Sequence, residues 1–361
     1  MCRLGCTFES FKLRLDTANP MTKNITMAEL ANLAGVDVST VSRAINNSPL
    51  VKEATRQHVL EIADKTGYEI NASARNLRRQ SSETIGMVIP LRPESGQTIS
   101  DPFFLEMVAA VSHRASKRGY DLIINLPDEE QSISERRLLG TGKADGLIII
   151  GQAGRGERLM SLGNLEKKVV VWGGRTDESE VTIVGSDNRN GGFLATDHLL
   201  RLGRKRILFL GPVELPEVGL RFEGFVDAHR KFGADIDERL QLSVDFNADA
   251  IKAELSGFID SGLSFDAIVA ASDVLAISAV QALTERNINV PRDVAVVGYD
   301  NIGQSAHSIP SLTTIDQNIK HGGEIMVDLL LKKLDGETVK DELTDTQLVI
   351  RQSCGYNLAK A

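Results

Sequence analysis

The chain has 361 residues, of which 42% are hydrophobic and 5% aromatic, and its formal net charge at pH 7 is −8. This length and hydrophobic content are enough to bury a large core, which excludes a disordered chain. The acidity disfavours nucleic-acid binding over the whole surface. Residues 21–82, however, carry eight Lys or Arg against six Asp or Glu. A local basic segment can contact phosphates while an acidic remainder limits non-specific attraction to DNA.

The cysteines Cys2, Cys6 and Cys354 have no disulfide or metal-ligand spacing with each other or with the six histidines. We therefore expect a reducing compartment, such as the cytoplasm, and no metal site. The segment CRLGC faintly resembles a lipoprotein cleavage site, but no apolar stretch precedes it and no run of residues approaches 18 apolar positions. We expect neither export nor a membrane span. Residues 1–22 are expected to be a leader, either a disordered arm or a segment upstream of a true start at Met21.

Residues 25–47, ITMAELANLAGVDVSTVSRAINN, have the spacing of a helix-turn-helix. Thr26 and Glu29 can form a capping box at the start of a first helix, and Gly35 suits its end. The expected buried stripe of this helix is Leu30, Leu33 and Ala34.

A second helix is expected to follow an N-cap at Asp37, with Val41 and Ile45 on its inner face. The outer face and ends then carry Val38, Ser39, Thr40, Ser42 and Arg43. Small polar residues beside an arginine suit a DNA major groove. Ordinary helical bundles contain such hairpins too, so this pattern alone does not decide between DNA binding and a purely structural role.

Residues 51–68 predict a third amphipathic helix. Its expected inner residues are Val51, Ala54, Val59, Ile62 and Ala63. The next segment, NASARNLRRQSS, has three arginines and no acidic residue, which is typical of a basic hinge between domains.

Beyond residue 83, short apolar runs alternate with amphipathic stretches, as in parallel βαβ units. The expected strands include TIGMVIP, YDLIINL, ADGLIIIG, KKVVVWGG, VTIVGSD, RILFLGP, FDAIVAASD and DVAVVGYD. The expected helices include residues 103–118, 191–202, 220–232 and one that ends at Arg286. The pattern predicts two doubly wound subdomains with a ligand cleft between them, outside the carboxyl ends of their strands.

The segments TMAELANLAGVDVSTVSRAINN, TRQHVLEIADKTGY and NASARNLR closely resemble the headpiece and hinge of LacI/GalR-type transcription regulators. The resemblance continues through DPFFLEM, VGSDNRNGG, RFEGF, DVAVVGYDN and SLTTIDQN, and spans Ile25 to Gly355. It implies a helix-turn-helix domain at 23–70, a hinge at 71–82 and a periplasmic-binding-protein-like effector and dimerisation domain at 83–361. It also implies three chain crossings between the subdomains, with a boundary near residues 184–190 and the last crossing near Ser311 to Asn318.

The resemblance also assigns an effector pocket by motif. The residues that it implies, together with the single tryptophan at the end of VVVWGG, are Phe103, Phe104, Trp172, Arg221, Phe246, Ser272, Asp300 and Gln317. Carboxylate, guanidinium and amide groups pair with sugar hydroxyls, and aromatic rings cover the C–H face of a pyranose. Each has a structural alternative: core packing for the aromatic residues, a surface ion pair for Arg221 and a cap for Asp300. Structural roles are also expected for Asp187 and Asp273.

For DNA, the resemblance implies that Val38, Ser39 and either Ser42 or Arg43 face base edges. It implies that Thr26, Thr40 and Asn46 hold phosphates, and that Leu77, flanked by Arg75 and Arg78, wedges into the minor groove. The alternative for Leu77 is packing on the body.

Four residues at three places depart from the family pattern. Gly173 and Gly174 follow Trp172 where the strand often ends in Asp, which implies a different ligand orientation. Ile70 replaces the usual proline before the hinge, and Lys52 replaces a serine cap at the third helix, at a cost of about 1 kcal/mol.

These observations predict a repressor that binds palindromic operator DNA as a homodimer, under allosteric control by a saccharide, with no cofactor, catalytic residue or metal. RPESGQTISDPFF and VVVWGG resemble a subgroup associated with α-glucosides or sucrose. A purine or other corepressor is the alternative effector, and an exported sugar-transport receptor is a remote alternative. GQAGRGE is not a GxGxxG motif, and neither GxxxxGK[ST] nor GxSxG occurs, so an enzyme is not expected. No heptad-bearing helix follows LVIRQSCGY, so we expect no tetramer-forming extension.

Overall fold

The structure, a computed structural model, describes residues 25–45, 47–68, 81–91, 97–127, 134–151, 163–174, 181–246 and 248–356. The chain divides into two compact units, Met1–Arg78 and Arg79–Ala361, and each is described by itself.

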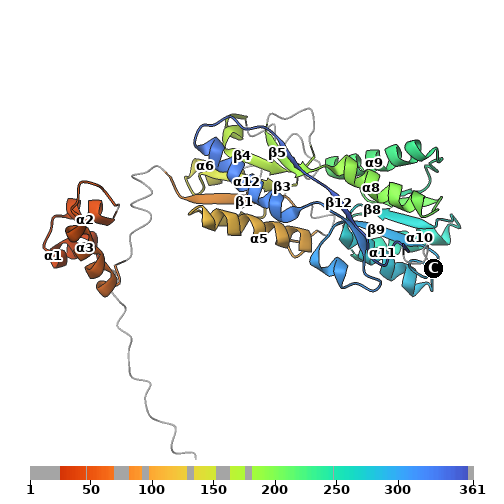
Figure 1. Cartoon of the computed structure of the whole chain (residues 1–361), viewed down its shortest axis with the longest axis horizontal. Coiled ribbons are helices and arrows are strands. Elements are labelled where there is room, and N and C mark those ends of the chain that lie inside the picture. The colour runs from red at the N-terminus through yellow and green to blue at the C-terminus, as the bar shows by residue number, and fades with distance from the viewer. Residues whose placement is uncertain are drawn as a thin grey trace, which may run out of the picture. The chain divides into compact units, whose positions relative to one another are not determined.

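The described residues of the first unit form the helices α1 (Met27–Ala34), α2 (Val38–Ile45) and α3 (Glu53–Thr66) (Figure 1). The capping box of Thr26 and Glu29 is present at the start of α1, as predicted. Helix α1 ends at Gly35 in the left-handed conformation, with φ 63°, where glycine carries no steric penalty. Lys52 precedes α3 with no side-chain cap, as its replacement of serine predicted.

The core of this unit differs from prediction at two positions. Leu33 is 57% exposed, and the buried face of α1 carries Ala31 in its place. The buried residues Leu30, Ala31 and Ala34 follow the spacing of one helical face, and Leu33 lies beside that face. Ala54 is likewise exposed, because it lies off the face of α3 that buries Val59.

The second unit has two lobes, each built on a six-stranded sheet (Figure 1). The sheet of the first lobe has the order β11-β5-β4-β3-β1-β2 and is parallel throughout. Its strands are β1 (Thr84–Val88), β2 (Asp121–Asn125), β3 (Gly146–Ile150), β4 (Val169–Trp172), β5 (Thr182–Ser186) and β11 (Glu342–Thr344).

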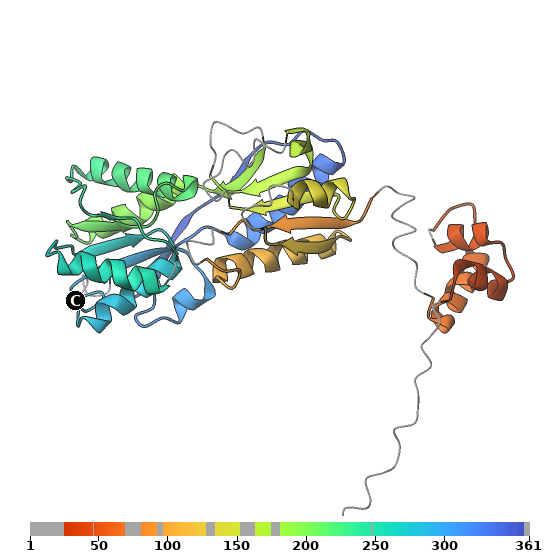
Figure 2. The ribbon, with the colours of Figure 1, turned by 180° about the vertical axis from the view of Figure 1, so that it is seen from behind.

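Helices cover both faces of this sheet. Helices α5 (Pro102–Lys117) and α12 (Ile319–Leu334) pack on one face, while α6 (Ser134–Gly140) and the 3₁₀ helix η2 (Gly163–Lys168) lie on the other (Figure 2). The unbroken apolar runs of β3 and β4 are fully buried, as expected for strands covered on two faces.

The sheet of the second lobe has the order β12-β10-β9-β8-β6-β7, and only β12 is antiparallel to its neighbour. Its strands are β6 (Ile207–Leu210), β7 (Gln241–Leu242), β8 (Ala267–Ala270), β9 (Ala295–Asp300), β10 (Thr313–Asp316) and β12 (Gln347–Val349). Helices α8 (Asn188–Arg201) and α9 (Pro216–Phe232) pack together, and α10 (Ala248–Asp260) packs with α11 (Asp273–Glu285). The 3₁₀ helix η3 (Gly303–Ala306) follows β9.

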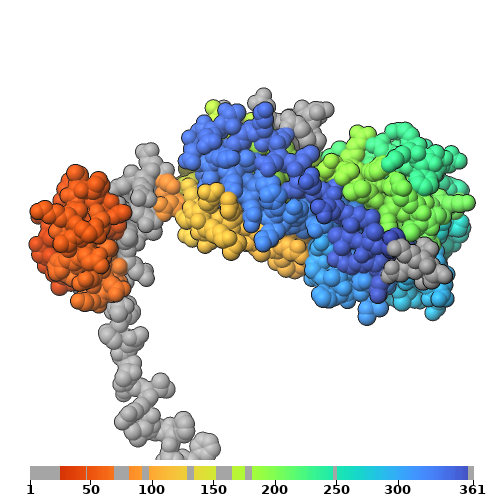
Figure 3. Space-filling view, in the orientation of Figure 1, coloured from red at the N-terminus to blue at the C-terminus, as the bar shows by residue number. Residues whose placement is uncertain are grey.

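The chain passes between the lobes three times, as predicted, but the position expected for the last crossing is wrong. The first passage follows β5, inside the predicted boundary at 184–190. The passage between β10 and α12 is the second, and the third lies at residues 345–346, between β11 and β12. Figure 3 shows this C-terminal part of the chain, in blue, on both lobes. The short strands β11 and β12 have no strong apolar pattern, because each is a sheet edge with exposed residues.

Candidate functional site

Helix α2 of the first unit presents a solvent-facing side. Val41 and Ala44 are buried against the other two helices, whereas Val38, Ser39 and Arg43 are exposed. Thr40 and Ser42 are half-buried. The exposed set is the one expected on the outer face, so it is available to a partner as large as a duplex.

Of the remaining predicted DNA contacts, one is already hydrogen-bonded within the protein and the others lie outside the described residues. The Thr26 hydroxyl donates to Glu29 Oε2 over 2.8 Å and accepts from the Glu29 N–H over 3.3 Å, so the capping box already engages it. Asn46, Arg75, Leu77 and Arg78 lie outside the described residues, as does Ile70.

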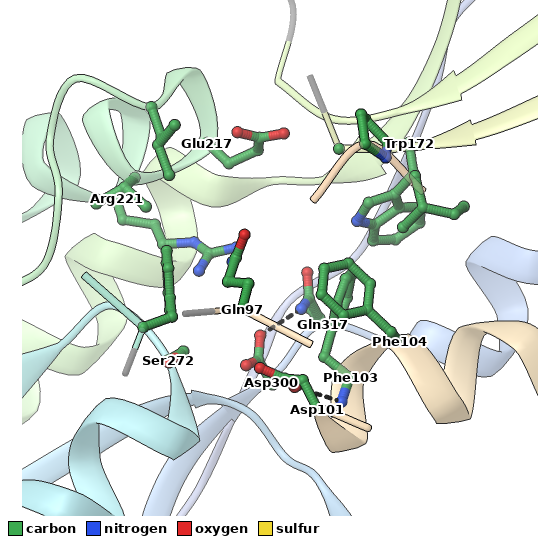
Figure 4. A pocket seen from close by; sticks show the side chains of 16 residues that line it. Gln97, Asp101, Phe103, Phe104, Trp172, Glu217, Arg221, Ser272, Asp300 and Gln317 are labelled. Atoms are coloured by element: carbon green, nitrogen blue, oxygen red, sulfur yellow. Dashed lines mark hydrogen bonds between the residues drawn. The ribbon is translucent and has the colours of Figure 1, made fainter. Parts of the chain in front are cut away.

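A cavity lies between the two lobes of the second unit (Figure 4). All eight predicted effector residues line it: Phe103, Phe104, Trp172, Arg221, Phe246, Ser272, Asp300 and Gln317. The first three belong to the first lobe, whereas Arg221, Phe246, Ser272 and Asp300 belong to the second. Gln317 lies at the second crossing. Residues more than 200 positions apart therefore meet in one place.

Asp300 and Gln317 form the polar floor of this cavity. Gln317 Nε2 donates to Asp300 Oδ1 over 2.5 Å, and Ser186 Oγ donates to Gln317 Oε1 over 3.1 Å. Burial raises the pKa of Asp300 well above its usual range, although the charge of Arg221 opposes the rise. This carboxyl therefore gains from hydrogen-bond donors that a ligand brings.

Asp273 lies next to this polar floor and holds the residues around it by hydrogen bonds. It is fully buried and accepts hydrogen bonds from Ile302 N–H (3.0 Å), Ser305 Oγ (2.5 Å) and Thr314 Oγ1 (2.5 Å). These bonds hold the backbone that follows Asp300. Asp187 caps α8 by accepting from the Asn190 N–H, so both aspartates have the structural roles that were expected.

Arg221 is buried and held from three sides. Its Nε donates to Asn188 Oδ1 over 2.8 Å, its Nη1 donates to the Ala271 carbonyl, and its guanidinium carbon lies 3.7 Å from the centre of the Tyr299 ring. Among the described residues, Arg221 forms no ion pair with a surface acid, which was the alternative considered for it. Its Nη2 has no hydrogen bond in that part of the chain and can donate to a ligand.

Aromatic rings form the wall on the first lobe. The rings of Phe103 and Phe104 meet edge to face, with centroids 5.4 Å apart. Trp172 is 4% exposed and packs in the core of its lobe, but it also lines the cavity. Gly322 on α12 makes room for it, because a Cβ there would overlap the indole.

Three polar lining residues were missed from the sequence: Gln97, Asp101 and Glu217. Asp101 precedes Pro102 and caps α5 by accepting from the Phe103 N–H over 2.9 Å. An aspartate before a proline at a helix start is a recognisable signal that could have identified Asp101. Glu217 follows Pro216 in the first turn of α9, which marks a helix start but no ligand. Gln97 had no such signal.

The lobes also contact each other at two places beside the cavity. Glu106 Oε1 on α5 accepts from the Gly303 N–H of η3 over 3.0 Å. Gly174, after β4, lies against the start of α9, where a Cβ would be 3.3 Å from Glu217 N. Both contacts join the first lobe to the second, so they depend on how far the cleft is closed.

No helix of the described residues is long and apolar enough to span a bilayer. Within the same residues, no cluster of three His, Cys, Asp or Glu side chains has a geometry that could hold a metal ion. Cys354 is a buried free thiol, and Cys2 and Cys6 lie outside the described residues.

Comparison with family models finds two matches. Residues 26–71 match "Bacterial regulatory proteins, lacI family", and residues 196–354 match "Periplasmic binding protein-like domain". The first match contains the exposed helix α2, and the second contains Arg221, Phe246, Ser272, Asp300 and Gln317 of the cavity.

The chain is also similar to whole proteins. It is 31% identical to the HTH-type transcriptional regulator MalR of Clostridium butyricum over 90% of its own length and 98% of that protein. A transcriptional regulator CelR–cellobiose complex aligns with a TM-score of 0.67 and 30% identity, over 91% of this chain and 99% of the other. The Lac repressor dimer bound to operator and the anti-inducer ONPF aligns with a TM-score of 0.80 and 26% identity, over 92% and 99%. These relatives are regulators and not enzymes.

Proposed function

From the premise that the chain belongs to the LacI family of bacterial regulatory proteins, we propose that it is a repressor whose affinity for a palindromic operator is set by a saccharide. The saccharide binds in the cavity between the lobes. The observation that carries this proposal is the convergence of seven motif-matched residues and Trp172 on that one cavity.

The DNA half of the proposal is supported by the first unit. Val38, Ser39 and either Ser42 or Arg43 on α2 read base edges in the major groove. Thr40 holds a phosphate. Thr26 contributes to phosphate binding indirectly, by positioning the start of α1, since its hydroxyl is used in the capping box. Asn46 and the hinge residues Arg75, Leu77 and Arg78 keep the roles that the resemblance implies for them.

The ligand half is supported by the chemistry of the cavity. A polyol needs hydrogen-bond donors and acceptors, and these are provided by Asp300, Gln317 and Ser272. The guanidinium of Arg221 is held in place by Asn188, so its Nη2 has a fixed direction in which to donate to the ligand. Trp172, Phe103, Phe104 and Phe246 cover the C–H faces of the sugar. The relative solved with cellobiose shows that a family member of similar sequence accommodates a disaccharide.

The first lobe exposes apolar side chains that a homodimer would bury. Ile123, Ile124 and Leu126, in and after the edge strand β2, are large apolar residues that remain exposed in the single chain, and Leu105 of α5 is exposed too. A two-fold axis would place two headpieces on the two halves of a palindrome. The cytoplasm is the compartment where such a regulator meets DNA.

Titration of the single tryptophan, Trp172, tests the ligand and its effect together. The fluorescence of the full-length protein is followed with disaccharides, monosaccharides and purines, in the presence and absence of a palindromic operator fragment. We expect a saturable response to a saccharide and a fall in operator affinity at saturation, because ligand and operator stabilise different arrangements of the lobes.

The other outcomes distinguish the alternatives. A response to a purine that raises operator affinity would make the protein a corepressor-dependent regulator. A protein that binds saccharides but no member of an operator library would contradict the regulator function and favour a receptor.

A further inference from the structure

Glu217 gives the cavity an unbalanced charge. Among the described residues that line it, three carboxyl groups, those of Asp101, Glu217 and Asp300, face one guanidinium, that of Arg221. Asp101 caps α5 and Asp300 is bound by Gln317, so both have donors from the protein. The third carboxyl, that of Glu217, lies at the start of α9.

The Glu217 carboxylate accepts hydrogen bonds from backbone N–H groups. It accepts from its own N–H at the start of α9 and from the N–H of Gly174 on the opposite lobe. No lysine or arginine in the described part of the chain forms an ion pair with it. Figure 4 shows its carboxylate directed into the opening between Arg221 and Trp172.

Arg221 does not neutralise this surplus. Its charge acts on both Glu217 and Asp300, and two of its nitrogens already donate to Asn188 and to the Ala271 carbonyl. Burial raises the pKa of Glu217 and of Asp101, and at Glu217 the charge of Arg221 and two backbone N–H donors oppose the rise.

We propose that Glu217 makes the cavity selective for ligands that present hydroxyl or ammonium donors and carry no negative charge. A neutral or amino-bearing saccharide binds, and the same saccharide with a carboxylate or phosphate does not. The inference rests on the proposed role of the cavity as the effector site and adds the class of effector. Repulsion between like charges in a cleft of low dielectric constant is the cause of the exclusion, and charge-assisted hydrogen bonds are the cause of the preference.

The test compares Glu217→Gln with wild type. Glutamine keeps nearly the same shape and one acceptor oxygen but removes the charge. Glu214→Gln is the matched control, because it removes the same charge from an exposed position three residues earlier that does not line the cavity. The probes share one β-1,4 skeleton and differ in charge: cellobiose is neutral, fully deacetylated chitobiose is cationic and cellobiuronic acid is anionic.

Calorimetric titration of the full-length protein measures each affinity. We expect wild type and Glu214→Gln to bind cellobiuronic acid at least about tenfold more weakly than cellobiose. Glu217→Gln should reduce that ratio to about threefold or less and should lose most of the affinity for chitobiose. Equal binding of the acid and cellobiose by wild type would overturn the proposal, as would unchanged ratios in Glu217→Gln.

Operator affinity, measured by fluorescence anisotropy in the same samples, separates this proposal from the proposed function. If all three proteins bind operator but none binds any probe or any sugar of the Trp172 panel, the saccharide effector is refuted together with this inference, while the DNA-binding function stands. If operator binding fails and the charge ranking holds, the selectivity stands and the regulator function does not.

Discussion

Asp300 lies in a backbone conformation that few residues other than glycine adopt, with φ 119°, and Asn301 follows with φ 56°. Such conformations cost about 1–3 kcal/mol each and persist where neighbours hold them. Here the Asn301 side chain donates to Asp316 Oδ2 and accepts from Arg351 Nη2, while Asp273 holds the next N–H. The direction of the Asp300 carboxyl therefore depends on groups outside the cavity.

The pKa of Asp273 provides a test of this support. Burial raises it to about 6, above the ordinary value of 3.8. The folded state therefore binds more protons than the unfolded state between about pH 4 and pH 6, and the contribution of Asp273 to stability falls as the pH rises through that range. Asp273→Asn removes this titration and weakens three hydrogen bonds, so we expect it to lower the free energy of unfolding by about 1–3 kcal/mol.

Urea unfolding followed by Trp172 fluorescence at pH 5 and pH 7 measures the effect. The gap in stability between wild type and Asp273→Asn should be smaller at pH 7 than at pH 5. A gap that grows with pH would mean that folding favours the ionised form of Asp273 and would refute the direction of its pKa shift.

At the scale of single elements, α1 and α3 begin in different ways. Helix α1 has a complete capping box, whereas α3 follows Lys52, whose extended backbone is suited to a cap but whose side chain provides none. Since a serine at an N-cap can accept a hydrogen bond from an N–H of the first turn, we expect Lys52→Ser to stabilise α3 by about 0.5–1 kcal/mol.

Hydrogen exchange of the amides in residues 53–66 of the intact protein measures this gain. Thr26→Ala serves as the opposite control, since loss of the capping box should speed exchange in α1 by a similar free energy. Unchanged or faster exchange in α3 of Lys52→Ser would show that another group already satisfies its first N–H groups.

At the scale of the whole molecule, the two edge strands of the first sheet differ in how apolar their surroundings are, and we expect only one of them to take part in a dimer. Ile124 on β2 is 42% exposed among other exposed apolar residues, and Leu343 on the opposite edge strand, β11, is 59% exposed among polar ones. An apolar edge strand is open to pairing with a second chain, and burial of such a patch favours association. We expect Ile124→Lys to weaken the dimer and, with it, operator binding, and Leu343→Lys to leave both unchanged.

Sedimentation velocity over a range of concentrations, with operator binding on the same samples, tests this expectation. Loss of the dimer in Leu343→Lys but not in Ile124→Lys would place the interface on the other edge. A wild type that is monomeric at all concentrations would contradict the homodimer.

The features that were predicted correctly from the sequence depend on short stretches of the chain. The capping box of Thr26 and Glu29, the left-handed Gly35 and the buried runs of β3 and β4 depend on residues within a few positions of each other. Starts of α8 and α9 were predicted three and four residues late, because Asn188 and Pro216 lie before the apolar pattern begins. Helices α10 and α12 and the short strands were not assigned.

Tertiary structure decided the rest, because it depends on contacts between distant residues. Motif resemblance indicated seven residues of the cavity and the single tryptophan an eighth, but only the packing of two lobes brings Glu217 near Gly174 and Trp172, and no periodicity encodes that contact. The third crossing at residues 345–346 likewise follows from two edge strands joining separate sheets. The sequence by itself determined the helices of the headpiece and the alternation of strands and helices in the βαβ units, since these follow from local hydrogen bonds and apolar spacing, and its motifs indicated the family. The charge balance of the cavity was decided only by the fold, since charges interact through space and not along the chain.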